Sequence, residues 1–93
     1  MKIIKKTIIK NYNLLLEKGM NLGSEGNISV KFRDKVFITP SGIDIKNLKT
    51  ENISIIDSEG HLRNGVKPSS ELDLHLLIYK KRKEVNSIVH CHS

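Results

Sequence analysis

The chain has 93 residues with 16 basic and 10 acidic side chains, a formal net charge of +6, and this length allows at most one domain of the usual ~100–150 residues. One cysteine excludes an internal disulfide framework and indicates a reducing compartment such as the cytoplasm, while every apolar run falls far short of the ~20 residues of a membrane helix. Aromatic residues are only 4% and lysines are spread along the chain, so the charge favours an anionic small molecule over a nucleic-acid partner.

The first predicted element is an amphipathic helix over residues 2–18. Apolar residues recur there at steps of three and four, and Gly19 follows at a position typical of a helix C-cap. Residues 21–27 combine glycines with small polar side chains, a composition that favours a loop. We expect this loop to present backbone amides.

Two β-hairpins are predicted next. Their strands are marked by alternating or continuous apolar residues, and the links between them are short and polar, as in the turn of residues 57–60. The four strands are predicted at residues 28–32, 36–39, 53–56 and 61–63.

The period then changes to that of a helix over residues 70–83, where Leu72, Leu76 and Tyr79 form one apolar stripe. Ser70 followed by Asp73 matches the capping-box pattern at its start. Residues 87–92 form a last predicted strand. This order of helix, antiparallel strands, helix and strand indicates an α/β or α+β fold.

His90 and His92 are the sharpest chemical feature. On a strand they face the same side, about 6.6 Å apart between Cα atoms, a spacing at which two imidazoles can share one cation such as zinc. The same pattern also fits two histidines on a partly exposed strand face. Cys91 points to the opposite side and is predicted to be a core residue.

Glu71 lies in the first turn of the second helix, where an acidic side chain complements the helix dipole without any function. It is also placed to act as a general base or a metal ligand. Two short pairs, Gly26-Asn27 and Ser41-Gly42, flank predicted strands and offer backbone N–H groups of the kind that bind phosphate, although each is also a common turn.

Together and in this order, these segments resemble the class II aldolase/adducin family. The resemblance spans the whole chain, so residues 1–93 are expected to be the N-terminal part of a single domain of this type. The segments that carry it are residues 26–29, 38–42, 67–71 with His75 and Tyr79, and 89–93.

The resemblance implies an α/β/α sandwich around a mostly antiparallel sheet, incomplete in this chain, and a homotetramer with active sites between subunits. It implies that His90 and His92 bind a divalent metal, usually Zn²⁺, and that Glu71 is the acid/base carboxylate and an additional metal ligand. The residues matched to substrate phosphate binding are Asn27, Ser41, Gly42, Ser69 and Ser70.

The reaction implied is metal-dependent aldol cleavage of a ketose 1-phosphate, of the fuculose 1-phosphate type, to dihydroxyacetone phosphate and an aldehyde. The metal would polarise the carbonyl as a Lewis acid, and Glu71 would move the proton. Glu71 after two serines favours this branch, because the sugar-phosphate 4-epimerases of the family typically carry Asp there. The alternatives are such an epimerase, or a non-catalytic fragment that binds an anion or a partner.

Two further histidines are weighed differently. His75 lies one helical turn after Glu71, where it either orients the Glu71 carboxylate or a neighbouring loop by hydrogen bonding or is a satisfied residue at a contact between helix and sheet. His61, beside a turn, is predicted to be a surface residue. The family's third metal histidine lies well beyond the His90 strand, so we expect this chain to be the N-terminal piece of a longer, truncated enzyme.

Overall fold

The computed structural model describes residues 2–20, 26–42 and 47–91. Its five strands form one sheet in the order β4-β3-β2-β1-β5, and every neighbouring pair is antiparallel. The predicted order of elements and the mostly antiparallel sheet are thereby confirmed. The elements are α1 (Lys2–Glu17), β1 (Asn27–Phe32), β2 (Lys35–Ile38), a 3₁₀ helix (Thr50–Asn52), β3 (Ser54–Ile56), β4 (Leu62–Asn64), α2 (Leu72–Lys81) and β5 (Ser87–His90).

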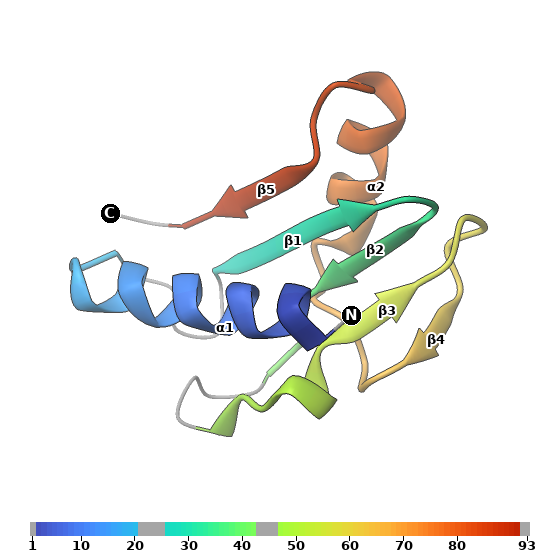
Figure 1. Ribbon diagram of the computed structural model, residues 1–93. Helices are drawn as coiled ribbons and strands as arrows, with labels where there is room; N and C mark the ends of the chain where they lie inside the picture. The colour runs from blue at the N-terminus through green and yellow to red at the C-terminus, as the bar shows by residue number, and fades with distance from the viewer. Residues whose placement is uncertain (1, 21–25, 43–46, 92–93) are drawn as a thin grey trace.

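The two helices lie on opposite faces of the sheet, as Figure 1 shows. This follows from the alternation of side chains along a strand: in β2, Phe37 packs toward α1, whereas Val36 and Ile38 pack toward α2. The result is a three-layer α/β/α arrangement with a core on each face. The buried core residues are Ile8, Tyr12, Ile28, Phe37 and Ile53 under α1, and Val36, Ile38, Ile56 and Tyr79 under α2.

The helix ends follow local hydrogen bonding. At the end of α1, the N–H groups of Gly19 and Met20 donate to the carbonyls of Leu16 and Leu15 at 3.1 and 3.0 Å, which confirms the predicted C-cap. The capping box predicted from Ser70 and Asp73 is wrong. Glu71 is the N-cap residue of α2, and its side chain makes no capping hydrogen bond.

The start of α2 is held instead by Ser69. Its hydroxyl accepts a hydrogen bond from the Glu71 N–H at 3.1 Å, and its carbonyl accepts one from the Leu72 N–H at 3.1 Å. The helix therefore begins two residues later than predicted, because Ser69 closes the turn that the sequence pattern assigned to Ser70.

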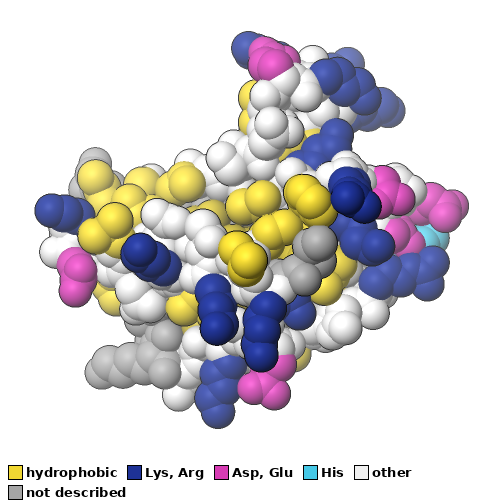
Figure 2. All heavy atoms as spheres, in the orientation of Figure 1, with side chains coloured by type: hydrophobic (Ala, Val, Ile, Leu, Met, Phe, Trp, Pro, Cys, Tyr) yellow, Lys and Arg dark blue, Asp and Glu magenta, His cyan; other side chains and the backbone are white. Residues whose placement is uncertain are grey.

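The surface mixes charge and apolar groups. Figure 2 shows Lys and Arg side chains distributed around one face, with hydrophobic side chains gathered between them. Ile3, Leu14 and Leu16 of α1 are among the exposed large hydrophobic residues. No helix in the described part of the chain is both long and apolar enough to cross a membrane.

Candidate functional site

Two serine-bearing segments that are distant in the sequence run antiparallel beside each other. The Ser41 N–H donates to the Lys67 carbonyl at 2.9 Å, and the Ser69 N–H donates to the Thr39 carbonyl at 3.0 Å. Pro40 and Pro68 form an isolated bridge between these bonds. The main chain therefore brings together the two loops that the resemblance matched to phosphate binding.

Thr39 also ties this pair of segments to the start of β1. Its N–H donates to the Ile28 carbonyl at 3.0 Å, and its hydroxyl accepts a hydrogen bond from the Ile28 N–H at 3.2 Å. Asn27, the residue before Ile28, therefore lies at the same end of the sheet. Among the proposed phosphate residues, Gly42 and Ser70 are exposed, Ser41 and Ser69 are half-buried, and Asn27 is 1% exposed.

Two of the three candidate metal ligands, His90 and Glu71, lie close together at this same end. β5 pairs with β1 so that His90 lies opposite Asn27, and Nδ1 of His90 is 3.7 Å from Oε1 of Glu71 at the start of α2. Both side chains are partly exposed, 35% for His90 and 41% for Glu71. His92 lies outside the described residues.

An imidazole and a carboxylate this close form a donor set that suits zinc and similar divalent metals. The alternation along β5 also fits, because Cys91 packs with the core under α1, as predicted, while His90 faces the α2 side. The described residues therefore fit a divalent metal between β5 and the start of α2.

A buried hydrogen-bonded network joins β1 to α2 and includes Asn27, the residue opposite His90. Oδ1 of Asn27 is 2.5 Å from Nε2 of His75, and Nδ1 of His75 is 2.6 Å from the Ser29 hydroxyl. That hydroxyl is in turn 2.7 Å from the hydroxyl of Tyr79. His75 is thus a satisfied residue between helix and sheet, and it also contacts a predicted site residue.

Sequence reasoning did not single out Ser29. A signal was present: Asn27 and Ser29 share one face of a strand, and His75 and Tyr79 share one face of a helix. Four hydrogen-bonding side chains at those two spacings, on elements expected to pack together, indicate a polar contact between helix and sheet. All four are at most 2% exposed.

The environment of His75 disfavours its charged form. Burial, and secondly the charge of His90, lower the pKa of His75 to about 4 from 6.5, against a smaller opposite effect of Glu71. Burial also raises the pKa of the Tyr79 hydroxyl, against the opposing hydrogen bond of Ser29. Both side chains are therefore neutral near pH 7.

This pKa predicts acid sensitivity. The pKa of His75 is lower in the folded protein than in the unfolded chain. The unfolded state therefore binds more protons between pH 6.5 and 4, and stability falls as the pH falls. Protonation of His75 on unfolding should lower the free energy of unfolding of the metal-free protein by about 2 kcal/mol between pH 7 and pH 5. Urea unfolding at both pH values measures the loss, and His75→Gln should remove that part of it. An equal pH dependence in this variant would contradict the assignment.

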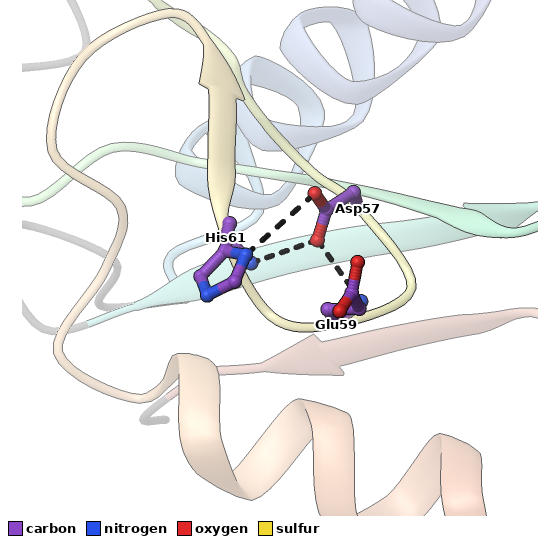
Figure 3. A group of neighbouring side chains, drawn as sticks. All are labelled: Asp57, Glu59 and His61. Atoms are coloured by element: carbon purple, nitrogen blue, oxygen red, sulfur yellow. Dashed lines mark hydrogen bonds and ion pairs between the residues drawn. The ribbon is translucent and has the colours of Figure 1, made fainter.

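A second group of donors lies in the turn between β3 and β4, where Figure 3 shows Asp57, Glu59 and His61 close together. The Asp57 carboxylate accepts hydrogen bonds from the N–H groups of Glu59 and His61, both at 2.9 Å, and pairs with Arg63 at 2.6 Å. The bonds from His61, and then that from Arg63, lower the pKa of Asp57 to about 2. Its oxygens are therefore engaged in closing the turn.

His61 itself is exposed, with 68% of its side chain accessible, which confirms its prediction as a surface residue. The turn lies between β3 and β4, at the sheet edge opposite β5 in the strand order. It is thus remote in the sheet from His90, and we assign it a structural role.

Known proteins are similar to this chain in sequence and in fold. The model of the Class II Aldolase and Adducin N-terminal domain matches residues 6–93. L-fuculose phosphate aldolase of Methanocaldococcus jannaschii is 44% identical over 89 residues, which cover 96% of this chain and 49% of that relative. A 3-oxo-tetronate 4-phosphate decarboxylase of Haemophilus influenzae is 45% identical over 78 residues, covering 83% and 37%.

Solved structures agree. An L-fuculose 1-phosphate aldolase matches with a TM-score of 0.94 and 35% identity over 100% of this chain and 45% of its own. The L-fuculose-1-phosphate aldolase of Thermus thermophilus matches with a TM-score of 0.78 and 26% identity, over 99% and 47%. The chain thus spans about half the length of these L-fuculose phosphate aldolases. With the family model matched over nearly all its residues, the chain belongs to the class II aldolase and adducin family.

Proposed function

We propose that this chain is the N-terminal part of a metal-dependent aldolase that cleaves a ketose 1-phosphate, of the L-fuculose 1-phosphate type, to dihydroxyacetone phosphate and an aldehyde. The observation that carries the proposal is the meeting of Glu71 and His90, 3.7 Å apart, beside the paired loops of Ser41 and Ser69. A candidate base, a candidate metal ligand and a candidate anion site thus share one end of the sheet. Similarity to proteins named L-fuculose phosphate aldolase supports it.

The loops would hold the substrate phosphate. Ser41, Ser69 and Ser70 offer hydroxyl donors, and Gly42 and Ser70 offer backbone N–H donors, all hydrogen-bond partners of a phosphate oxygen. Holding the phosphate fixes the orientation of the reacting carbons, which lie at the other end of the substrate. The neutral loops thus supply the directional contacts, and the net charge of +6 supplies the long-range attraction.

His90, His92 and Glu71 would hold the metal, which we propose is Zn²⁺. When bound, such a metal supplies Lewis-acid polarisation of the substrate carbonyl. Glu71 would return a proton to the substrate carbon after the carbon–carbon bond breaks, and remove it in the reverse direction. Its proximity to His90 supports both roles for this carboxylate.

The subunit arrangement and location of the enzyme are also proposals. We infer a cytoplasmic homotetramer with active sites between subunits, in keeping with the resemblance and with the single cysteine. A decarboxylase is the second candidate reaction, because a relative with that name is 45% identical to this chain.

The test uses the protein made from the complete open reading frame that contains these 93 residues. Supplied with Zn²⁺ and L-fuculose 1-phosphate, it should release dihydroxyacetone phosphate, measured by coupled NADH oxidation. Carbon dioxide release from a 3-oxo-tetronate 4-phosphate, without cleavage of the ketose phosphate, would favour the second candidate. A protein that takes up no zinc, cobalt or manganese would contradict the proposal.

The phosphate assignment predicts the effect of Ser70→Ala. Ser70 is exposed, so its truncation should leave the fold intact and remove one hydrogen bond to a charged group. We expect KM to rise about tenfold with kcat nearly unchanged. The matched control is Ser58→Ala, an exposed serine in the turn between β3 and β4, which should change neither constant. Equal behaviour of the two variants would contradict the assignment.

A further inference from the structure

Lys67 lies directly opposite Ser41 in the antiparallel pair of loop segments. The bridge between Pro40 and Pro68 sets the register, so the residues one step to either side of it also face each other. The bond from the Ser41 N–H to the Lys67 carbonyl, 2.9 Å long, agrees with this register. Opposite residues of an antiparallel pair project to the same side, with Cβ atoms about 5 Å apart. The side chain of Lys67 therefore leaves the pair on the same side as the Ser41 hydroxyl.

Ser69 belongs to this side as well. Residues two positions apart in an extended segment share a face, so Ser69 follows Lys67 on the side that carries Ser41. Two of the predicted phosphate residues thus flank Lys67, one across the pair and one along the chain. The segments that form the candidate phosphate site are residues 26–29, 39–42 and 67–71, and Lys67 is the only lysine or arginine among them.

The main chain around Lys67 is fixed, although its side chain is exposed. The preceding carbonyl, that of Val66, accepts a hydrogen bond from the Ser54 hydroxyl at 2.5 Å. Its own carbonyl is held by Ser41, and the following residue, Pro68, restricts Lys67 to extended backbone angles. Within the described part of the chain, no hydrogen bond or ion pair uses the Lys67 side chain. The fold thus sets where the side chain begins, and its flexible stem lets the ammonium group meet a ligand.

We propose that Lys67 is a further substrate-binding residue, whose ammonium group pairs with the substrate phosphate held between the loops of Ser41 and Ser69. This inference rests on the proposed function, in which these loops bind that phosphate. The donors of the loops are neutral, whereas a phosphate monoester carries a charge of about −2 near pH 7. Lys67 supplies the positive charge that the loops lack, and a hydrogen bond to a charged partner is stronger for it.

This charge bears on which substrates the site accepts. Neutral hydroxyl and N–H donors bind the hydroxyl of an uncharged sugar as well as a phosphate oxygen. A cation beside them favours the phosphate, by an attraction that falls off with distance and is therefore local to the site. It differs from the long-range attraction of the net charge, to which every lysine of the chain contributes.

The test measures binding of inorganic phosphate, by calorimetry, to the protein made from the complete open reading frame. Lys67→Met removes the charge and keeps a long side chain, and Lys67→Arg keeps the charge. The matched control is Lys83→Met, which changes the net charge equally at an exposed lysine beyond the C-terminal end of α2. We expect Lys67→Met to bind phosphate about tenfold more weakly than the wild type, and the other two variants to bind it within about twofold.

Two further readouts distinguish a charge pair from a structural role. In turnover of L-fuculose 1-phosphate, Lys67→Met should raise KM with little change in kcat, because the phosphate lies away from the reacting carbons. Its weaker binding of phosphate should also approach that of the wild type in about 1 M salt, where exposed charge pairs are screened. Unfolding curves check that the variants are folded.

The outcomes separate this inference from the proposed function. If the wild type binds phosphate and Lys67→Met binds it as tightly as Lys83→Met does, the role of Lys67 is overturned and the phosphate site stands. Equal weakening in Lys67→Arg and Lys67→Met also overturns that role, because the retained charge should restore binding. A wild-type protein that binds no phosphate overturns the proposed function itself, and the role of Lys67 with it.

Discussion

Glu71→Gln is expected to lower the rate of aldol cleavage by a factor of about 10²–10⁴, the usual contribution of a general acid or base. Gln has nearly the same shape as Glu but cannot take up a proton at neutral pH. Because the main-chain N–H of Glu71, and not its side chain, donates to the Ser69 hydroxyl, the start of α2 should be unchanged in the variant. The effect should therefore be on chemistry and not on folding.

Two measurements isolate the proton transfer. The first is kcat for release of dihydroxyacetone phosphate, and the second is exchange of the hydroxymethyl proton of dihydroxyacetone phosphate with deuterium, which needs no aldehyde. Both should fall together. Metal content should fall much less, because His90 and His92 are expected to keep the metal in place.

Glu59→Gln is the matched control for Glu71→Gln. Glu59 is an exposed glutamate in the turn between β3 and β4, close to His61, and so resembles Glu71 in having an acidic side chain near a histidine. We expect it to retain full turnover and metal content. Unchanged turnover in Glu71→Gln would contradict its role as base, and a loss in Glu59→Gln would point to the turn instead.

The elements were predictable because their signals are local. Periods of two and of three to four residues marked the hairpins and both helices, and alternation placed His90 at the end of β5, and Cys91 directly after it, on opposite faces of the sheet. Helix ends were less accurate, since whether Ser69 or Ser70 closes the turn depends on geometry that a short pattern does not specify.

The site depended more on contacts between distant residues. The pairing of Ser41 with Lys67 joins segments with a whole hairpin between them, and no local pattern encodes it. The sequence linked these two segments only through the resemblance to a known family, which matched Ser41 and Ser69 to phosphate binding. For His75, the structure confirms one of the two interpretations weighed from sequence, a buried histidine satisfied at the contact between helix and sheet by Asn27 and Ser29, and the orienting role stays a prediction.

Of the four glycines compared in the described part of the chain, Gly65 is the one at which an added Cβ would clash. It follows β4 with φ of +85°, and a Cβ there would lie 2.1 Å from the carbonyl oxygen of Ile53 and 2.9 Å from Cα of Ser54. Both neighbours are main-chain atoms of fully buried residues, so they cannot turn aside as a flexible side chain would. Room for an alanine therefore requires a shift of β3, which is paired on both sides.

We expect Gly65→Ala to lower the free energy of unfolding by about 4 kcal/mol or more, well above the usual effect of a point substitution. Gly60→Ala is the matched control, because Gly60 has nearly the same φ, +88°, but its Cβ would meet only Cδ1 of Leu76 at 3.9 Å. It carries the backbone strain of a positive φ alone, about 1–2 kcal/mol. Urea unfolding of both variants measures the difference, which isolates the close approach of β4 to β3. A difference in the free energy of unfolding below about 1 kcal/mol would contradict the predicted clash, because it would mean that β3 shifts at little cost.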